Sequence, residues 1–240
     1  MTDLVTDTAM LMAAGLGKRM RPLTATTPKP LVRVAGKPLI DRALDRLDEA
    51  GVARAIVNVH YLADAIEAHI GSRQAPKVTF SDERDQLLET GGGMVKALNA
   101  GLLPDPFFAC NADSIWLDGP RNAFAELSAA WNPDQMDALL MLVTHARAYN
   151  FDGIGDFYMD GAGRLKRKLP GRIAPFIYTG IQLVSHRLLH DSPEGKFSTN
   201  ILWDRSIDEG RLFGIAFTGH WYEVGTPAHI RPTEMALTGG

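Results

Sequence analysis

A short basic turn follows the first apolar run of the chain, which spans residues 9–13. The turn contains Gly15 and Gly17, and the cations Lys18 and Arg19 come directly after them. Backbone N–H groups beside glycine can approach a polyphosphate closely, and neighbouring cations can neutralise its charge. These residue types in this order therefore predict phosphate chemistry at the end of an apolar strand.

Two common phosphate loops do not fit this turn. The dinucleotide-binding fingerprint requires a third glycine where this chain has Met20, and it requires a helix at once, whereas Pro22 and later prolines keep the segment extended. The Walker A loop ends in lysine followed by serine or threonine, but Lys18 is followed by Arg19. A loop that uses glycine and proline only to turn is a third alternative, but it has no need for cations at fixed positions.

The remaining pattern is Gly-x-Gly-x-Arg-Met-x-Pro-Leu-Thr, followed by Thr-Pro-Lys-Pro-Leu around Lys29. It resembles the signature of the sugar-1-phosphate nucleotidylyltransferases, which condense a nucleoside triphosphate with a sugar 1-phosphate and release pyrophosphate. The resemblance implies that Arg19 binds the leaving phosphates and that Lys29 reaches the α-phosphate. It also implies that the nucleotide is bound by Ala13, Ala14, Gly15, Gly17, Lys18, Arg19 and Lys29.

Two carboxylates are candidates for a metal site. Asp113 follows the apolar strand predicted over 106–111. An aspartate after a strand is more often a turn or capping residue, but beside a phosphate loop it suits Mg²⁺, which prefers few carboxylates together with waters and phosphate oxygens. The resemblance implies a second ligand in segment 219–227, where the family has aspartate and this chain has Glu223. The alternative is that Glu223 is only an exposed residue at a strand end.

Three consecutive glycines, residues 91–93, precede a helix that we predict over 94–102. Glycines at a helix N-terminus allow a planar base to lie against the backbone. The resemblance implies that Glu83 contacts the base edge and that Gly92 makes a backbone contact. The cluster is similar to that of the uridylyltransferases that act on N-acetylmuramate 1-phosphate, so UTP and this sugar phosphate are the expected substrates. A glycine-rich helix entry without any ligand is the alternative.

The expected acceptor site depends on fewer signals. Asn111 lies beside the predicted metal ligand and could bond a sugar hydroxyl or acyl group. A basic run over 164–168 could meet the sugar phosphate through Lys168, although such runs are more often solvated faces. The resemblance further implies sugar contacts from Tyr178, Thr179 and Gly180.

The elements that must position these residues alternate between strands and helices. This alternation indicates βαβ units and a mostly parallel sheet, with ligands at the carboxyl ends of its strands. The expected strands of this nucleotide-binding part, about residues 9–120, span 9–13, 54–60, 77–81 and 106–111, and its helices span 39–50, 61–70 and 94–102. The second part, about 138–225, is predicted to form a small antiparallel sugar-binding lobe with strands over 138–143, 153–159, 175–184 and 212–217. Helices are expected over 199–208 and 226–237.

The fold class predicted from these elements is therefore α/β, with a Rossmann-like, mostly parallel mixed sheet flanked by helices. The family resemblance implies the glycosyltransferase-A-like variant of this architecture. No long linker divides the 240 residues, so we expect a single nucleotidyltransferase domain over 1–240.

Composition limits the classes of partner. The net charge of −3 gives no general attraction for nucleic acid, and no apolar run is long enough to cross a membrane. Cys110 is the only cysteine and the acidic segment 1–8 lacks the basic start of a secretory signal, so we expect a cytoplasmic protein. It is expected to be a monomer or a small homo-oligomer.

Other functions stay open from the sequence alone. The same reaction could use dTTP with glucose 1-phosphate, GTP with a mannose or heptose phosphate, or CTP with another sugar phosphate. A non-catalytic nucleotide-sugar sensor that keeps the fold is a rival from another class, and Glu223 in place of aspartate is the feature that favours it.

Overall fold

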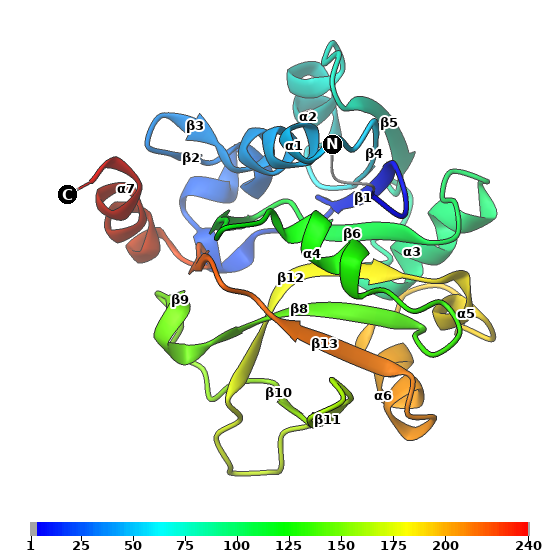
Figure 1. Ribbon diagram of the computed structural model, residues 1–240. Helices are drawn as coiled ribbons and strands as arrows, with labels where there is room; N and C mark the ends of the chain where they lie inside the picture. The colour runs from blue at the N-terminus through cyan, green and yellow to red at the C-terminus, as the bar shows by residue number, and fades with distance from the viewer. Residues whose placement is uncertain (1–3, 240) are drawn as a thin grey trace.

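The computed structural model describes residues 4–239, so the first three residues of the acidic segment 1–8 lie outside the described residues. One nine-stranded sheet forms the centre, and helices cover both of its faces (Figure 1). Four strands are parallel neighbours in the order β6-β1-β4-β5. They are β1 (Thr8–Met12), β4 (Arg54–Val59), β5 (Lys77–Asp82) and β6 (Phe107–Asn111). The parallel sheet predicted for the first half of the chain is confirmed.

The remaining strands continue the same sheet instead of forming a separate layer. β12 (Phe176–Val184) runs antiparallel to β6 and joins the two halves. β8 (Ala138–Thr144) pairs antiparallel with β12, and β13 (Leu212–Ala216) pairs parallel with β8. β10 (Phe157–Met159) and β11 (Leu165–Arg167) extend the edge beyond β12. Because β13 is parallel to β8, the second part of the sheet is itself mixed, whereas the sequence predicted an antiparallel lobe.

Residues that alternate along the central strands pack into two separate cores. On β1, Leu11 faces one core and Met10 the other, and on β6 Phe108 and Phe107 divide in the same way. This alternation follows from the two-residue period of a strand, and it leaves each strand buried on both faces. The first core is covered by α1 (Leu39–Ala50), α2 (Ala63–Ile70) and α4 (Ala123–Ala130). The second is covered by α3 (Glu89–Asn99), α5 (His186–Leu189) and α6 (Asn200–Asp208).

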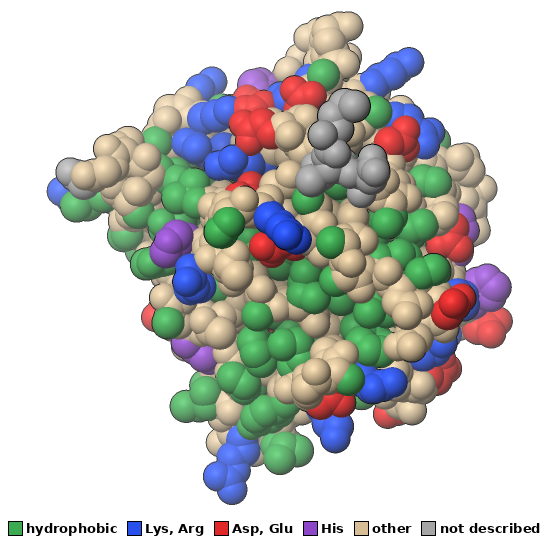
Figure 2. All heavy atoms as spheres, viewed as in Figure 1, with side chains coloured by type: hydrophobic (Ala, Val, Ile, Leu, Met, Phe, Trp, Pro, Cys, Tyr) green, Lys and Arg blue, Asp and Glu red, His purple; other side chains and the backbone are tan. Residues whose placement is uncertain are grey.

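Helix α1 shows why the sequence forms these elements. Its apolar side chains recur at helical spacing and are buried, while its charged side chains face outward. Gly51 ends the helix in the left-handed conformation, with φ at 91°, and its N–H donates to the carbonyl groups of the last turn. In the upper part of the face drawn in Figure 2, where α1 lies in Figure 1, basic and acidic side chains are interspersed.

A small second sheet lies at the carboxyl ends of the central strands. It has the order β7-β14-β9, made of β7 (Ser114–Leu117), β14 (His220–Glu223) and β9 (Ala148–Tyr149). A short hairpin of β2 (Arg33–Val34) and β3 (Lys37–Pro38) precedes α1, and α7 (Ile230–Thr238) closes the chain. The sequence did not predict β7, β9, β14 or α4. Their residues are two to eight in number, and such short runs carry little periodicity.

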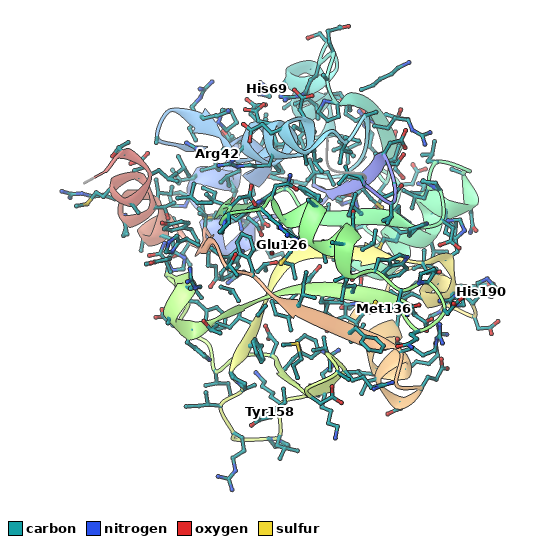
Figure 3. All side chains as sticks on the ribbon, viewed as in Figure 1. Arg42, His69, Glu126, Met136, Tyr158 and His190 are labelled. Carbon is teal, nitrogen blue, oxygen red and sulfur yellow. The ribbon has the colours of Figure 1, made fainter. Side chains whose placement is uncertain are left out.

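Tyr158 fixes the exposed loop between β11 and β12. It projects from β10 in the lower part of Figure 3, and its hydroxyl donates to the carbonyl of Ile173 at 2.8 Å.

None of the helices within residues 4–239 is both long and apolar enough to cross a membrane.

Candidate active site

The loop over residues 13–31 leaves the carboxyl end of β1 and folds over it in three short 3-10 turns. Gly17 starts the first turn in the left-handed conformation, with φ at 58°. A Cβ atom at Gly17 would lie 3.0 Å from Lys29 Cβ and 3.0 Å from Thr24 Cγ2, so a larger side chain would separate the two halves of the loop. The Thr24 hydroxyl also donates to the Gly17 carbonyl at 2.8 Å. These contacts hold the basic turn against the segment that carries Lys29.

Lys29 is held rigidly and points at Asp113. The prolines on either side of it are buried, and its own side chain is only 12% exposed. Its Nζ atom lies 2.6 Å from Asp113 Oδ2, at the end of β6. A cation shielded from water in this way acts more strongly on a nearby anion than an exposed one does. Lys29 therefore presents a positive charge, shielded from water, beside Asp113.

A second cation–carboxylate pair lies next to the first. Arg19 NH1 is 3.3 Å from Glu223 Oε1. The antiparallel register of β14 and β7 sets Glu223 opposite Ser114, which adjoins Asp113 in the chain. A Cβ atom at Gly225 would come within 2.8 Å of the Glu223 carboxylate and 3.0 Å of Arg19 NH1, so a larger residue would require these two side chains to shift.

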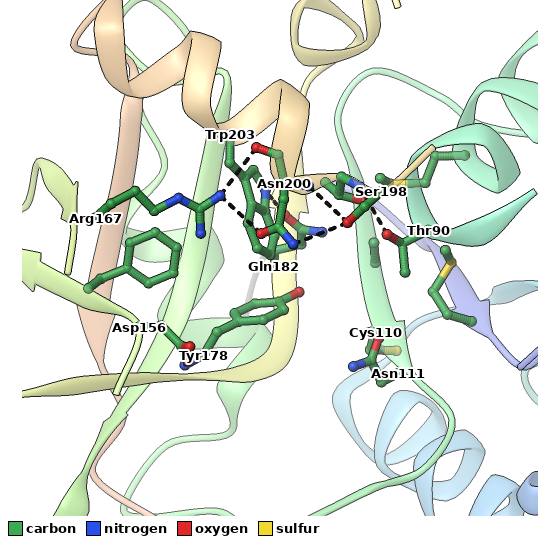
Figure 4. A pocket seen from close by; sticks show the side chains of 15 residues that line it. Thr90, Cys110, Asn111, Asp156, Arg167, Tyr178, Gln182, Ser198, Asn200 and Trp203 are labelled. Atoms are coloured by element: carbon green, nitrogen blue, oxygen red, sulfur yellow. Dashed lines mark hydrogen bonds between the residues drawn. The ribbon is translucent and has the colours of Figure 1, made fainter. Parts of the chain in front are cut away.

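Three connected cavities run along the carboxyl ends of β1 and β6. The loop cavity, about 430 Å³, is lined by the basic turn together with Lys29 and Asp113. The joining cavity, about 220 Å³, is lined by both cation–carboxylate pairs and by Asn111 and Tyr178. The sheet cavity, about 290 Å³, lies beyond Asn111 and Tyr178, between β12 and α6 (Figure 4). Because neighbouring cavities share these lining residues, they form one cleft.

Most of the residues predicted to bind the nucleotide line the loop cavity. The members that line it are Ala13, Gly15, Gly17, Lys18, Arg19 and Lys29. Ala14 is buried and does not line any of the three cavities. The predicted phosphate loop therefore surrounds a common space.

The carboxylates of the cleft suit a hard cation with few protein ligands. Asp113 and Glu223 both line the joining cavity. Among residues 4–239 there is no group of three or more His, Cys, Asp or Glu side chains placed to hold a metal ion. Zn²⁺ usually takes three or four such ligands, whereas Mg²⁺ is commonly held by one or two carboxylates with waters and phosphates. The donor set therefore fits Mg²⁺ bound together with a phosphate substrate.

Glu83 lies beneath the cleft and not in it, contrary to the expectation that it contacts a base edge. It is fully buried, and its carboxylate accepts hydrogen bonds from Asn58 Nδ2 at 2.8 Å and from the Leu88 N–H at 3.2 Å. Asn58 Oδ1 in turn accepts from the Ala13 N–H at 2.7 Å. Burial raises the pKa of the Glu83 carboxyl above its ordinary value. In this arrangement Glu83 is linked through Asn58 to Ala13, which lines the loop cavity.

The glycine cluster lies inside a helix, so the prediction that the helix begins after it is wrong. Helix α3 begins at Glu89, and all three glycines are buried. A Cβ atom at Gly92 would lie 2.2 Å from the Gly195 carbonyl oxygen, and one at Gly93 would lie 2.8 Å from Glu83 Oε1. The physical reason for the glycines is therefore close packing against neighbouring backbone and side chains. Gly92 does not line any of the three cavities.

Of the residues predicted to contact the sugar, some line the cleft and others are buried behind its wall. Asn111 and Tyr178 line the sheet cavity, whereas Thr179 is buried and its hydroxyl donates to the Met141 carbonyl at 2.9 Å. Gly180 has φ at 86°, and a Cβ atom there would lie 2.7 Å from Asn111 Nδ2. Burial raises the pKa of Tyr178 well above its ordinary value, so its hydroxyl keeps its proton and can donate. Thr179 and Gly180 therefore support the cavity wall.

Within the basic run, the structure brings Arg167 to the sheet cavity and leaves Lys168 exposed. Arg167 lies on the same face of β11 as the buried Leu165, because alternate residues of a strand share a face, and Lys168 lies just beyond the strand. The sequence analysis placed Arg167 only within the basic run and predicted no strand over 165–167, so it could not use strand alternation to distinguish this residue.

Lys196 was also missed. It lies in the loop before α6, lines the loop cavity, and is 3.3 Å from Glu89 Oε1. No motif in the sequence distinguishes it from an ordinary surface lysine. It comes to the cleft only because the folded chain brings its loop beside the loop cavity.

A glycine-rich basic loop, two carboxylates at strand ends and a mixed α/β sheet together define a nucleotidyltransferase. Residues 9–179 match the MobA-like NTP transferase domain, and the chain belongs to this family. It is 47% identical over 233 residues to N-acetylmuramate alpha-1-phosphate uridylyltransferase of Caulobacter vibrioides, covering 95% of this chain and 96% of that protein. It is 35% identical over 243 residues to the protein of the same name from Neisseria meningitidis serogroup B, covering 96% and 98%.

Solved structures show the same fold. The inositol-1-phosphate CTP transferase of T. maritima superposes with a TM-score of 0.76 at 17% identity, covering 98% of this chain and 95% of that one. The glycosyltransferase-A-like, mixed α/β architecture implied by the sequence signature is therefore confirmed, and so is membership of the nucleotidyltransferases.

Proposed function

We propose that the protein transfers a uridylyl group from UTP to N-acetylmuramate 1-phosphate and releases pyrophosphate. The main support for this class of reaction is that two cation–carboxylate pairs line one cleft. They are Lys29 with Asp113 and Arg19 with Glu223. The substrates are supported by the name of the 47% identical relative, which this chain matches over almost its full length. Both substrates are cytoplasmic metabolites in this proposal, so the reaction belongs in the cytoplasm.

The chemistry requires electrostatic help more than proton transfer. An oxygen of the sugar phosphate attacks the α-phosphorus of UTP in line, a new P–O bond forms, and the bond to the bridging oxygen of pyrophosphate breaks. The attacking phosphate is already anionic, so the protein must bring two anions together and spread the charge of the transition state. Lys29 is placed for the α-phosphate and the attacking oxygen. Arg19, on the open side of the loop cavity, is placed for the leaving β- and γ-phosphates.

Asp113 and Glu223 are the residues that would hold Mg²⁺. Mg²⁺ held by these carboxylates would supply positive charge to the phosphate oxygens. The protein's own residues hold the loop in place: the buried prolines around Lys29 fix its direction, and the Glu83–Asn58 pair fixes the Ala13 N–H.

The acceptor fits the far part of the cleft. A sugar phosphate beside Lys29 and Asp113 would extend past Asn111 and Tyr178 into the sheet cavity. The Asn111 side chain faces this space and can bond a hydroxyl or acyl group of the sugar. Lys168 stays a prediction for the sugar phosphate, although its side chain is exposed and outside the three cavities.

The test is product identification by mass spectrometry. The protein is incubated with Mg²⁺ and each combination of UTP, dTTP, GTP or CTP with N-acetylmuramate, N-acetylglucosamine, glucose or mannose 1-phosphate. We expect UDP-N-acetylmuramate as the main product. A different nucleotide-sugar would replace these substrates but keep the reaction, whereas no product from any combination would support a nucleotide-sugar sensor.

A further inference from the structure

Arg167 is fixed from several sides at the wall of the sheet cavity (Figure 4). Its Nε–H donates to Asp204 Oδ1 at 2.6 Å, and NH2 donates to the Asn200 carbonyl at 3.2 Å and to Asn200 Oδ1 at 2.9 Å. The guanidinium also lies over the rings of Phe157 and Trp203, at 4.9 and 5.6 Å from their centroids. A side chain held by this many contacts has lost its rotational freedom before any ligand binds.

One side of this guanidinium stays free. Its NH1 group donates to no acceptor within residues 4–239, whereas Nε and NH2 are both engaged. Gln182 behaves similarly: it is 4% exposed, its Oε1 accepts from Trp203 Nε1 at 3.1 Å, and its amide nitrogen has no acceptor among the described residues. The hydroxyl of Tyr178 also points into this cavity in Figure 4. The cavity therefore presents donors that lack acceptors.

Two carboxylates lie near this cavity, and each accepts a hydrogen bond from the protein through one of its oxygens. Asp156 Oδ2 accepts from the Tyr178 N–H at 2.9 Å, and Asp204 is paired with Arg167. A ligand that supplies acceptor oxygens complements this wall, because it satisfies the free donors without displacing an existing bond, and a negative charge on it suits the side where Arg167 lies.

Arg167 is also separated from the phosphates. It lines the sheet cavity but neither the loop cavity nor the joining cavity, where Lys29 and Asp113 lie. An anion beside Arg167 is therefore a second negative group of the acceptor, carried on the sugar ring away from its 1-phosphate.

We propose that Arg167 is the specificity-determining residue of this chain and binds a carboxylate carried by the acceptor sugar. This inference rests on the proposed function, and it explains how the acceptor is chosen. N-acetylmuramate differs from N-acetylglucosamine by a lactyl ether that ends in a carboxylate, and glucose and mannose 1-phosphates have no such group. The free NH1 group of Arg167 binds that carboxylate, and Gln182 and Tyr178 donate to the remaining oxygens of the acceptor.

The test compares acceptors that differ only at this group. kcat and KM are measured with UTP and Mg²⁺ for N-acetylmuramate 1-phosphate, its lactyl primary amide and N-acetylglucosamine 1-phosphate. Arg167→Met removes the positive charge, and Arg167→Lys keeps a positive charge but lacks the planar guanidinium group. Lys166→Met is the matched control, because it removes an exposed cation from the opposite side of the same strand. Melting temperatures are recorded for every variant.

A hydrogen bond to a charged group corresponds to roughly 10- to 150-fold in affinity. The Arg167 side chain is 33% exposed, so we expect the lower part of this range. The wild type should prefer the acid to the amide by about 10- to 50-fold in kcat/KM, mostly through KM. Arg167→Met should lose this preference, Arg167→Lys should keep part of it, and Lys166→Met should keep all of it.

Two results would overturn the inference. One is a wild type that uses the acid and its amide equally well, and the other is an Arg167→Met protein that loses the same factor on all three acceptors, which would make Arg167 only a support of the wall. A wild type that is inactive on every acceptor and nucleotide would instead contradict the proposed function, so the two failures can be told apart.

Discussion

Lys29 Nζ and Asp113 Oδ2 lie 2.6 Å apart although 84 positions of the chain separate them. Lys29 belongs to the loop after β1 and Asp113 to the turn after β6, and these two strands are parallel neighbours. Their carboxyl ends meet at the same edge of the sheet, so chain topology alone brings a cation and a carboxylate together. Under the proposed function, a phosphate that enters between them would be attracted by Lys29, and Asp113 would help to hold Mg²⁺.

Removing the carboxylates should change the dependence on Mg²⁺. We expect Asp113→Asn to abolish turnover and Glu223→Gln to raise the Mg²⁺ concentration for half-maximal rate at least about 10-fold, because each change removes a charged oxygen ligand. Glu223→Asp, which restores the residue expected from the family signature, should stay within about 10-fold of the wild type. Steady-state rates across a Mg²⁺ titration measure this. Equal Mg²⁺ curves for Glu223→Gln and the wild type would remove Glu223 from the metal site.

Gly180→Ala should weaken acceptor binding specifically. A Cβ atom there meets Asn111 Nδ2 at 2.7 Å and Ser114 Oγ at 2.9 Å, and the backbone has φ at 86°. Gly171→Ala is the matched control, because φ is 68° but nothing lies within 4 Å of its Cβ position. Both variants should lose about 1 kcal/mol of stability from the left-handed conformation. Only Gly180→Ala should raise the acceptor KM, by about 10-fold, with the UTP KM unchanged. Parallel kinetics for the two variants would contradict this role of Gly180.

The buried carboxyl of Glu83 should give the protein a specific pH dependence. Burial raises its pKa in the folded state, so the folded protein retains a proton that the unfolded chain has already lost. Stability should therefore fall as pH rises from about 4.5 through the raised pKa, by about 1.4 kcal/mol for each unit of pKa difference. Glu83→Gln cannot ionise, so its unfolding free energy minus that of the wild type should become more positive over this range. Urea unfolding from pH 4.5 to 8 measures the difference.

Glu209→Gln provides the control for this experiment, since it removes an exposed carboxylate on the far end of α6. Its difference from the wild type should stay level across the same pH range. A level difference for Glu83→Gln as well would show that Glu83 has the same ionisation in the folded and unfolded states.

Cys110 should be unreactive despite lining the sheet cavity. It is 1% exposed, and burial raises the pKa of its thiol to about 12. Only the thiolate is nucleophilic, and at pH 8 about one thiol in ten thousand is then ionised. We expect less than about 5% labelling by iodoacetamide in an hour for the native protein, and complete labelling in urea, by mass spectrometry. Rapid stoichiometric labelling of the native protein would mean that the cavity opens to Cys110.

The parts of the site that could be predicted from the sequence are those whose residues lie close together in the chain and form a recognisable motif. The loop from Ala13 to Lys29 has a long pattern with fixed spacing, and Asp113 follows a strand whose apolar run is easily recognised. Both lie at the carboxyl ends of parallel strands, so their convergence follows from topology. Glu223 could be placed only by comparing its segment with a family pattern.

The parts that could not be predicted depend on packing between distant segments. The glycines over 91–93 signal flexibility in a sequence, but they are small because the Gly195 carbonyl and Glu83 pack against them. The role of Glu83 could not be predicted correctly, because the sequence does not show that Asn58 lies beside it and bonds its carboxylate. Arg167 became distinguishable from Lys168 only in the folded chain, where Arg167 lines the sheet cavity and Lys168 does not.

The most direct test of the account is the rate of nucleotide-sugar formation by Lys29→Met in a single turnover. Methionine keeps the apolar stem of Lys29 but removes the charge, and Lys77→Met removes an exposed lysine at the start of β5 as the control. We predict that Lys29→Met lowers the rate about 100- to 1,000-fold, as losing one transition-state donor does, with unfolding free energy changed by about 1 kcal/mol or less. Lys77→Met should match the wild type. A Lys29→Met protein that is folded and retains most of the wild-type rate would contradict the central claim that Lys29 acts on the reacting phosphates.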